Sequence, residues 1–145
     1  MMPEEESTTP DLVERARAMF AAGDRGDIDA AIGFFAPDVV WEMVGSGIRI
    51  DGAASLRDFM QDWVNRYEDY QWRAEEALDM RNDVVLVVYL DSGRPGGSTF
   101  TVQERGVVVI EWTGGLIVRV TDFDYDQIDE ARATAERLAQ ERADG

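Results

Sequence analysis

Carboxylates and phenols are the side chains that could do acid–base chemistry in this chain, because the sequence contains no His and no Cys. The 14 basic residues are all Arg, so there is no Lys either. These absences exclude thiolate and Schiff-base mechanisms and remove the commonest general base and metal ligand. Any proton transfer must therefore fall to Asp, Glu or Tyr, and we expect neither a cofactor nor a metal site.

The charge of the chain narrows its possible partners. With 30 acidic residues the formal charge is −16, which argues against nucleic acid and against an anionic membrane surface as partner. No apolar run approaches the ~20 residues that a membrane span needs, and the start, MMPEEESTTP, lacks the features of a secretory signal. We expect a cytoplasmic protein whose acidity provides solubility; an acidic docking face is the alternative.

A chain of 145 residues has the length of one domain and can bury a full core. Residues 1–8 are expected to form a disordered acidic tail, and residues 9–145 a single domain. Thr9-Pro10 predicts the start of a first helix that ends at Gly23.

The run of residues 26–44 predicts a second helix followed by a strand. Gly26-Asp27 is expected to cap the helix, whose apolar face runs from Ile28 to Phe35. Pro37 and its two neighbours should stop it, and residues 39–44 should be extended. The Gly-containing residues 45–52 are then expected to form a loop.

The remaining segments change from a helical period to an alternating one. The order of elements, ααβαββββα, suits one curved antiparallel sheet wrapped around helices. The expected elements are a helix over residues 54–67, strands over 70–80, 84–90, 100–112 and 116–125, a hairpin turn at Thr113-Gly114-Gly115, and a final amphipathic helix over 126–142.

The segment GDIDAAIGFFAPDVVWEMV, residues 26–44, resembles the entry to the cone-shaped α+β barrel of the nuclear transport factor 2-like superfamily, in particular its SnoaL-like branch. The resemblance covers about residues 10–128 and rests on pattern and turn positions. It implies an α+β fold with a curved, mostly antiparallel sheet wrapped around N-terminal helices, and a pocket for a small molecule.

Ketosteroid isomerase is one relative within that superfamily. Gapless matching places its catalytic Asp at Met43, its oxyanion-hole Tyr at Met19 and its protonated Asp at Val107-Val108. All of these residues are apolar here. The resemblance therefore implies no isomerase chemistry unless a bulge turns Glu42 inward, because neighbouring side chains of a strand face opposite ways.

Limonene epoxide hydrolase is a second relative, and matching places its two catalytic Asp residues at Asp91 and Asp122. In such a pair one neutral carboxyl protonates the epoxide oxygen while the other activates water. The supporting residues differ, since its Arg becomes Tyr89 and its water-holding Tyr and Asn become Trp41 and Met43. The alternative is that Asp91 merely precedes a turn and Asp122 belongs to an acidic strand end.

The SnoaL-like polyketide cyclases are a third comparison. They use an acidic residue as the base in the aldol closure of an aromatic precursor. The resemblance implies that Asp91 or Asp122 could be that base.

Strand parity predicts an apolar and deformable wall around the pocket. Such a wall suits a small apolar or aromatic ligand anchored by one or two polar groups; the alternative is that side chains fill the cone and leave no cavity. The residues expected to face inward are Met19, Trp41, Met43, Met60, Trp63, Val85, Val87, Tyr89, Val108, Ile110, Val118 and Val120.

Three functions follow from this sequence. The leading one is binding of a small, largely apolar molecule in the barrel, and the second is acid–base catalysis on such a molecule by Asp91 and Asp122. The third is a protein–protein adaptor that uses the outer sheet. Apolar residues expected to face outward also predict a homodimer that buries this face, and they are Leu86, Val88, Val107 and Val109.

Overall fold

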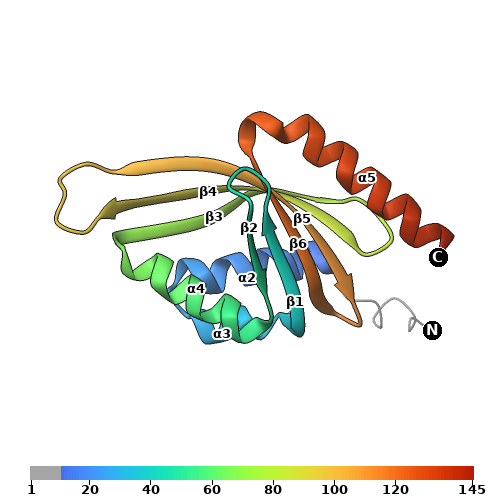
Figure 1. Ribbon diagram of the computed structural model, residues 1–145, viewed down its shortest axis with the longest axis horizontal. Coiled ribbons are helices and arrows are strands. Elements are labelled where there is room, and N and C mark those ends of the chain that lie inside the picture. The colour runs from blue at the N-terminus through green and yellow to red at the C-terminus, as the bar shows by residue number, and fades with distance from the viewer. Residues whose placement is uncertain (1–10) are drawn as a thin grey trace, which may run out of the picture.

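The computed structural model describes residues 11–145 as a curved sheet between two layers of helices (Figure 1). In chain order the elements are α2 (Leu12–Asp24), α3 (Ile28–Ile32), β1 (Phe35–Met43), β2 (Ile48–Asp51), α4 (Ala53–Asn65), β3 (Tyr67–Asp79), β4 (Val84–Pro95), β5 (Val102–Thr113), β6 (Leu116–Asp124), the 3₁₀ helix η1 (Tyr125–Gln127) and α5 (Ile128–Asp144).

The six strands follow the order β2-β1-β6-β5-β4-β3. All neighbouring strands are antiparallel except β1 and β6, which are parallel. The helices α2, α3 and α4 lie on one side of the sheet and α5 lies on the other (Figure 1). This arrangement confirms the predicted α+β cone with a mostly antiparallel sheet, although β2 and β3 remain free edges and the sheet does not close.

The first described helix begins after the predicted cap. The side chain of Asp11 accepts hydrogen bonds from the backbone N–H of Val13 at 3.1 Å and of Glu14 at 3.2 Å, so Asp11 is the N-cap of α2. The predicted cap at Thr9-Pro10 and the predicted acidic tail over residues 1–8 lie outside the described residues.

The second helix is shorter than predicted. Asp27 caps α3 as expected, accepting a hydrogen bond from the Ala30 N–H at 3.1 Å. However, α3 ends at Ile32, and Phe35 already belongs to β1, where it pairs with Ile117 of β6. Pairing with a neighbouring strand therefore overrides the helical pattern, and the prediction that Pro37 and its neighbours only stop a helix is wrong.

The predicted loop over residues 45–52 contains a strand. The four residues of β2 pair antiparallel with Val40 to Met43 of β1. Three of these four residues are exposed, so the segment shows no long apolar alternation. A short edge strand of this kind is specified by its partner more than by its own sequence.

A predicted hairpin turn is confirmed between β5 and β6. Gly114 and Gly115 have φ angles of 61° and 82°, the left-handed conformation that a two-residue hairpin turn requires. A register shift lies between Glu111 and Trp112, just before the turn, so that Glu111 pairs with Arg119 but Trp112 pairs with Ile117. This bulge places Ile117 in the inner core and leaves Val118 half-buried outside it, so the inward prediction for Val118 is wrong.

The concave side of the sheet carries the inner core, which packs against α2, α3 and α4. Met19 and Phe20 of α2 are almost completely buried, as is Leu56 of α4. The predicted inward residues that belong to this core are Met19, Trp41, Val85, Val87, Val108, Ile110 and Val120.

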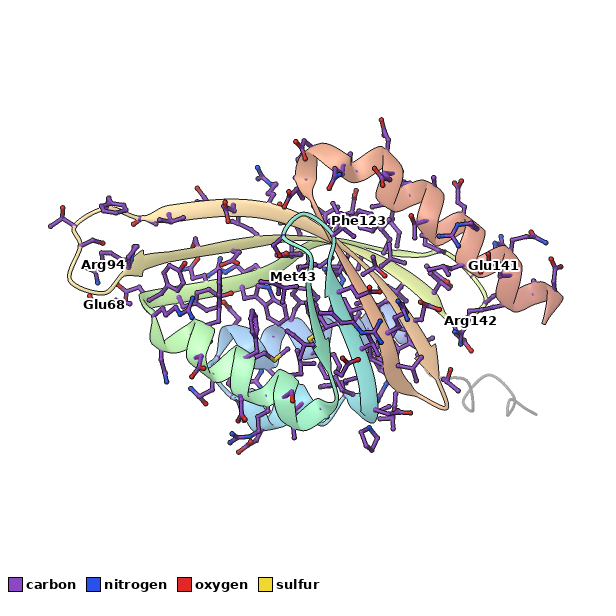
Figure 2. The ribbon with its side chains drawn as sticks, in the orientation of Figure 1. Met43, Glu68, Arg94, Phe123, Glu141 and Arg142 are labelled. Carbon is purple, nitrogen blue, oxygen red and sulfur yellow. The ribbon has the colours of Figure 1, made fainter. Side chains whose placement is uncertain are left out.

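The convex side of the sheet is covered by α5 of the same chain. Three alanines at a spacing of four residues, Ala131, Ala135 and Ala139, let α5 lie close to the sheet. Figure 2 shows Phe123 between α5 and the sheet. The apolar residues that predicted a dimer interface are thus buried in this second core: Leu86, Val88, Val107 and Val109. These residues therefore give no reason for a dimer, and the homodimer stays a prediction.

No helix between residues 11 and 145 is long and apolar enough to cross a membrane.

Candidate functional site

A cavity of about 220 Å³ lies between α4 and the concave face of the sheet. Its wall comes from the end of α2, from α3 and α4, and from strands β1, β3, β4, β5 and β6. The cone is therefore not filled by its own side chains. The aromatic residues in the wall are Trp41, Phe59, Trp63, Tyr70, Trp72 and Tyr89.

The structure divides the predicted pocket residues into two groups. Met19 and Val108 are completely buried in the inner core and do not line the cavity. Met43, whose position on β1 is labelled in Figure 2, belongs to the wall. The complete set of predicted residues in the wall is Trp41, Met43, Met60, Trp63, Tyr89, Asp91 and Asp122.

Asp122 is the most strongly connected polar group in the cavity. Its Oδ1 accepts a hydrogen bond of 2.8 Å from the Tyr89 hydroxyl, and its Oδ2 accepts one of 3.3 Å from Nε1 of Trp41. Burial in this apolar wall raises the pKa of Asp122 to about 7, although the two hydrogen bonds act in the opposite direction. Asp122 is therefore able to hold a proton near neutral pH.

Tyr89 reaches Asp122 because β5, the strand between them, carries a glycine at the crossing point. Gly106 pairs with Tyr89 on one side and with Asp124 on the other. A Cβ on Gly106 would stand 2.4 Å from both Cζ and Oη of Tyr89. A glycine directly before the β-branched run 107–110, inside a predicted strand, was the available sequence signal for this close approach.

Asp91 lies inside β4, which continues to Pro95, so the alternative that it merely precedes a turn is wrong. Burial raises the pKa of Asp91 to about 6, and the nearby Glu104 adds to the effect. A hydrogen bond with Tyr70 acts in the opposite direction. Asp91 is therefore a carboxyl that changes its charge within the physiological range.

Asp91 and Asp122 face the same cavity from separate places. Asp91 pairs with Glu104 of β5, whereas Asp122 pairs with Val108, four residues further along the same strand. Their Cα atoms are thus displaced by roughly 13 Å along the strand direction, in addition to two strand spacings. Each carboxyl has its own phenol partner, and the two do not share one proton.

Trp72 of β3 lines the cavity beside Gly23 of α2, although it is not among the predicted pocket residues. Its ring packs on Phe20 with a centroid distance of 4.1 Å, and its backbone N–H donates to Oδ1 of Asp24 at 2.8 Å. A Cβ on Gly23 would stand 2.5 Å from this ring. The alternation of Trp72 with the charged Arg73 was the available sequence signal for its position, but the partner helix cannot be read from a strand pattern.

The residues matched to ketosteroid isomerase give the site no base. Met43 carries no proton-transfer group, and Glu42 pairs with Arg119. Trp41 and Met43, on either side of Glu42, both face the cavity, so Glu42 faces the opposite side of the sheet. The register shift in β1 lies before Val40 and does not turn Glu42 inward.

The charged side chains that line the cavity are all acidic. Of the described residues 11–145, four carboxylates line it and no Arg does. Asp91 and Asp122 lie within the wall, while Glu104 and Asp124 are exposed at its edge. Among residues 11–145, no cluster of three or more Asp or Glu residues has a geometry suited to a metal ion. The arrangement can therefore accept hydrogen bonds, exchange protons and attract positive charge.

Three solved structures illustrate the relationship of this chain to other proteins. A hypothetical protein with a ketosteroid isomerase-like fold from Catenulispora acidiphila, in complex with trimethylamine, is 17% identical, with a TM-score of 0.68 over 87% of this chain and 95% of that one. A proposed SnoaL-like polyketide cyclase from Shewanella putrefaciens is 17% identical, with a TM-score of 0.67 over 87% and 98%. A proposed ketosteroid isomerase from Kribbella flavida is 27% identical, with a TM-score of 0.60 over 77% and 78%.

No curated protein matches the chain. The model of one family, the SnoaL-like domain, matches residues 16–120. This match spans most of the chain and agrees with the resemblance found in residues 26–44. The chain belongs to the SnoaL-like domain family.

Proposed function

We propose that this protein binds a small, largely apolar molecule in the cavity, with a polar group of that molecule placed at Asp122. The observation that carries the proposal is the bonding of Asp122 to Tyr89 and Trp41 inside an aromatic wall. Ligand pockets are commonly apolar with a few fixed polar groups that orient the ligand. Each oxygen of Asp122 has one donor and keeps a second lone pair for a ligand.

The size of the cavity and one relative support a small ligand. At about 220 Å³ the cavity lies below the ~300–1,000 Å³ of typical ligand pockets. The Catenulispora acidiphila protein with the same fold was crystallised with trimethylamine, a molecule of similarly small size. We therefore expect a ligand with no more than one ring.

A binding test can use ligand-observed NMR with benzyl alcohol, phenol and cyclohexanone as small neutral probes. We expect at least one to bind, and Met60→Trp to abolish binding by filling the cavity. Arg132→Trp, which adds the same side chain on the exposed face of α5, should leave binding unchanged. Binding of a probe that is equally tight in the Met60→Trp variant would contradict the proposal.

A second candidate function, acid–base catalysis, is favoured by the raised pKa values of both Asp122 and Asp91. In this function ionised Asp91 removes a proton from water, whose oxygen bonds to a carbon of an epoxide ligand. The C–O bond of that carbon breaks, and protonated Asp122 gives its proton to the released oxygen. The adaptor function has no comparable support, because α5 covers the apolar part of the outer sheet.

Hydrolysis of styrene oxide to its diol tests the second function. The reaction needs Asp122 protonated and Asp91 ionised, so its rate should peak between about pH 6 and 7. Asp91→Asn and Asp122→Asn should each lower the rate, whereas Asp38→Asn on the exposed part of β1 should not. Equal rates for all three variants would contradict catalysis and leave the binding proposal intact.

A further inference from the structure

We infer that the ligand of this cavity is an organic cation, held between aromatic rings and carboxylates. The inference rests on the proposed function and narrows it to one chemical class. It follows from the charges of the wall, the number of aromatic rings in it and the bonding of Asp122.

The wall excludes anionic ligands. Asp91, Glu104, Asp122 and Asp124 line the cavity and no Arg does. Arg57, Arg73 and Arg105 each follow a wall residue in the sequence, but they pair with Asp29, Asp24 and Glu75, which are not part of the wall. A carboxylate or phosphate ligand would therefore meet only like charge, whereas the total charge of −16 attracts cations to the opening.

The aromatic rings of the wall come from several elements of the fold. Trp72 and Tyr89 meet edge to face, with an angle of 68° between their planes and a centroid distance of 6.2 Å. Phe59 and Trp63 of α4 are stacked at 6.2 Å on another side, and Trp41 comes from β1. Aromatic rings carry partial negative charge on their faces, and a site lined by several such rings is the usual recognition site for substituted ammonium groups.

The hydrogen bonding of Asp122 also favours a cationic ligand. Its two donors, Tyr89 and Trp41, both come from the protein, so its remaining lone pairs are available to a ligand. An ionised Asp122 can accept hydrogen bonds or contact a positive charge, but it repels a ligand that offers only acceptors. A bound cation would replace the hydration that burial removes from this carboxylate.

The cation should bind more tightly as the pH rises. The titratable groups that face Asp122 are Tyr89 and Asp91 of β4 and Asp124 of β6, and the part of α4 in the wall contributes none. Burial raises the pKa of Asp122 to about 7, so the carboxylate carries its full charge only above that pH. At pH 6 the binding of a permanently charged cation should therefore release a proton from Asp122.

Choline and 3,3-dimethylbutan-1-ol form a matched pair of probes, because they have the same shape and differ in the charge of one atom. At pH 8 we expect choline to bind the intact chain at least about tenfold more tightly than 3,3-dimethylbutan-1-ol does, as measured by isothermal titration calorimetry. Its affinity should fall between pH 8 and pH 5, whereas the affinity of the neutral alcohol should not.

Three variants locate the preference for charge. Asp122→Asn and Asp91→Asn should each reduce the ratio of the affinity for choline to the affinity for 3,3-dimethylbutan-1-ol, which is the advantage of choline. Circular dichroism checks that both variants fold. Asp38→Asn removes the same charge from exposed β1 and should leave the advantage intact. Equal or tighter binding of the neutral alcohol would overturn the inference but keep the proposed function; failure of choline, the alcohol and the neutral probes at millimolar concentration would overturn both.

Discussion

The hydroxyl of Tyr89 on β4 donates a hydrogen bond of 2.8 Å to Asp122 on β6, across the whole width of β5. The ring crosses β5 at Gly106, where any side chain would occupy the same space. Three strands thus combine to place one phenol on one carboxyl. The pKa of Asp122 therefore depends on the packing of Tyr89 against Gly106.

Gly106→Ala is predicted to break this link. The new methyl group would overlap Tyr89, so the ring must move and the protein should lose about 1–3 kcal/mol of stability. The hydrogen bond from Tyr89 lowers the pKa of Asp122, so its loss should raise that pKa further, as carboxyl NMR titration would show. Tyr89→Phe should raise the same pKa without the overlap.

Gly96→Ala is the matched control for Gly106→Ala. The nearest atom to a Cβ there, the Arg66 carbonyl oxygen, is 3.8 Å away, so the methyl group fits. The Asp122 titration should stay unchanged in this variant. If Gly106→Ala left both stability and titration unaltered, Tyr89 would not be held as the structure shows.

The stability of the protein should fall as the pH rises from about 4 to 7. The pKa of Asp122 is about 7 in the folded chain, against an ordinary value of 3.8. The folded state therefore binds more protons than the unfolded state in this window, and the effect reaches up to about 4 kcal/mol. Asp91, with a pKa of about 6, acts in the same direction. Urea unfolding at several pH values measures the slope.

Asp122→Asn should remove most of this pH dependence. The amide accepts a hydrogen bond from Trp41 and donates one to the oxygen of Tyr89, so the contacts are kept without a charge. The variant should be more stable than the original chain at pH 8 and similar to it at pH 5. A variant less stable than the original at pH 8 would show that the ionised carboxylate is well accommodated.

The sequence predicted those parts of the structure that depend on local patterns. The apolar stripe of residues 54–67 became α4 except at its end, where the helix stops at Asn65 and Tyr67 begins β3. Gly114-Gly115 became a hairpin turn, because period and backbone conformation are properties of short segments. The inward sides of Trp41, Met43 and Tyr89 followed from alternation alone.

The parts that depend on partner elements could not be predicted. The bulge at Trp112 moved Ile117 into the core in place of Val118, and a bulge has no clear sequence signal here. The outer face of the sheet looked like a dimer interface until α5 was seen to cover it. The phenol partners of Asp91 and Asp122 come from other strands, so no spacing along the chain shows them.

Arg142 is predicted to hold α5 on the sheet (Figure 2). Its guanidinium lies 3.5 Å from the buried Glu111, donates to the Asn82 carbonyl oxygen at 2.9 Å and also contacts the Trp112 carbonyl oxygen. Arg142→Ala leaves Glu111 buried without its cation, which should cost about 3 kcal/mol in thermal or urea unfolding.

Arg137→Ala is the matched control on the same helix. Arg137 and Glu141 form a surface pair one turn apart, and both side chains are 59% exposed. Its removal should cost at most about 0.5 kcal/mol. Equal losses for Arg137→Ala and Arg142→Ala would show that Glu111 does not depend on Arg142.

The chain is predicted not to move a steroid double bond from the 5,6 to the 4,5 position. That reaction needs a carboxylate base and acidic donors for the dienolate, and the matched residues Met43, Met19 and Val108 supply none. Loss of one such donor alone typically costs about 100- to 1,000-fold in rate. Absorbance of the conjugated product would report any turnover.

Glu42→Gln tests whether Glu42 could act as the base if any steroid isomerisation is observed. Glu42 pairs with Arg119 on the side of β1 away from the cavity, so the variant should behave like the original chain, with no turnover in either. Turnover that disappears in Glu42→Gln would mean that β1 is rotated and that Glu42 is the base. Turnover that survives in Glu42→Gln but disappears in Asp122→Asn would instead assign the base to Asp122, because this carboxyl faces the cavity beside Met43.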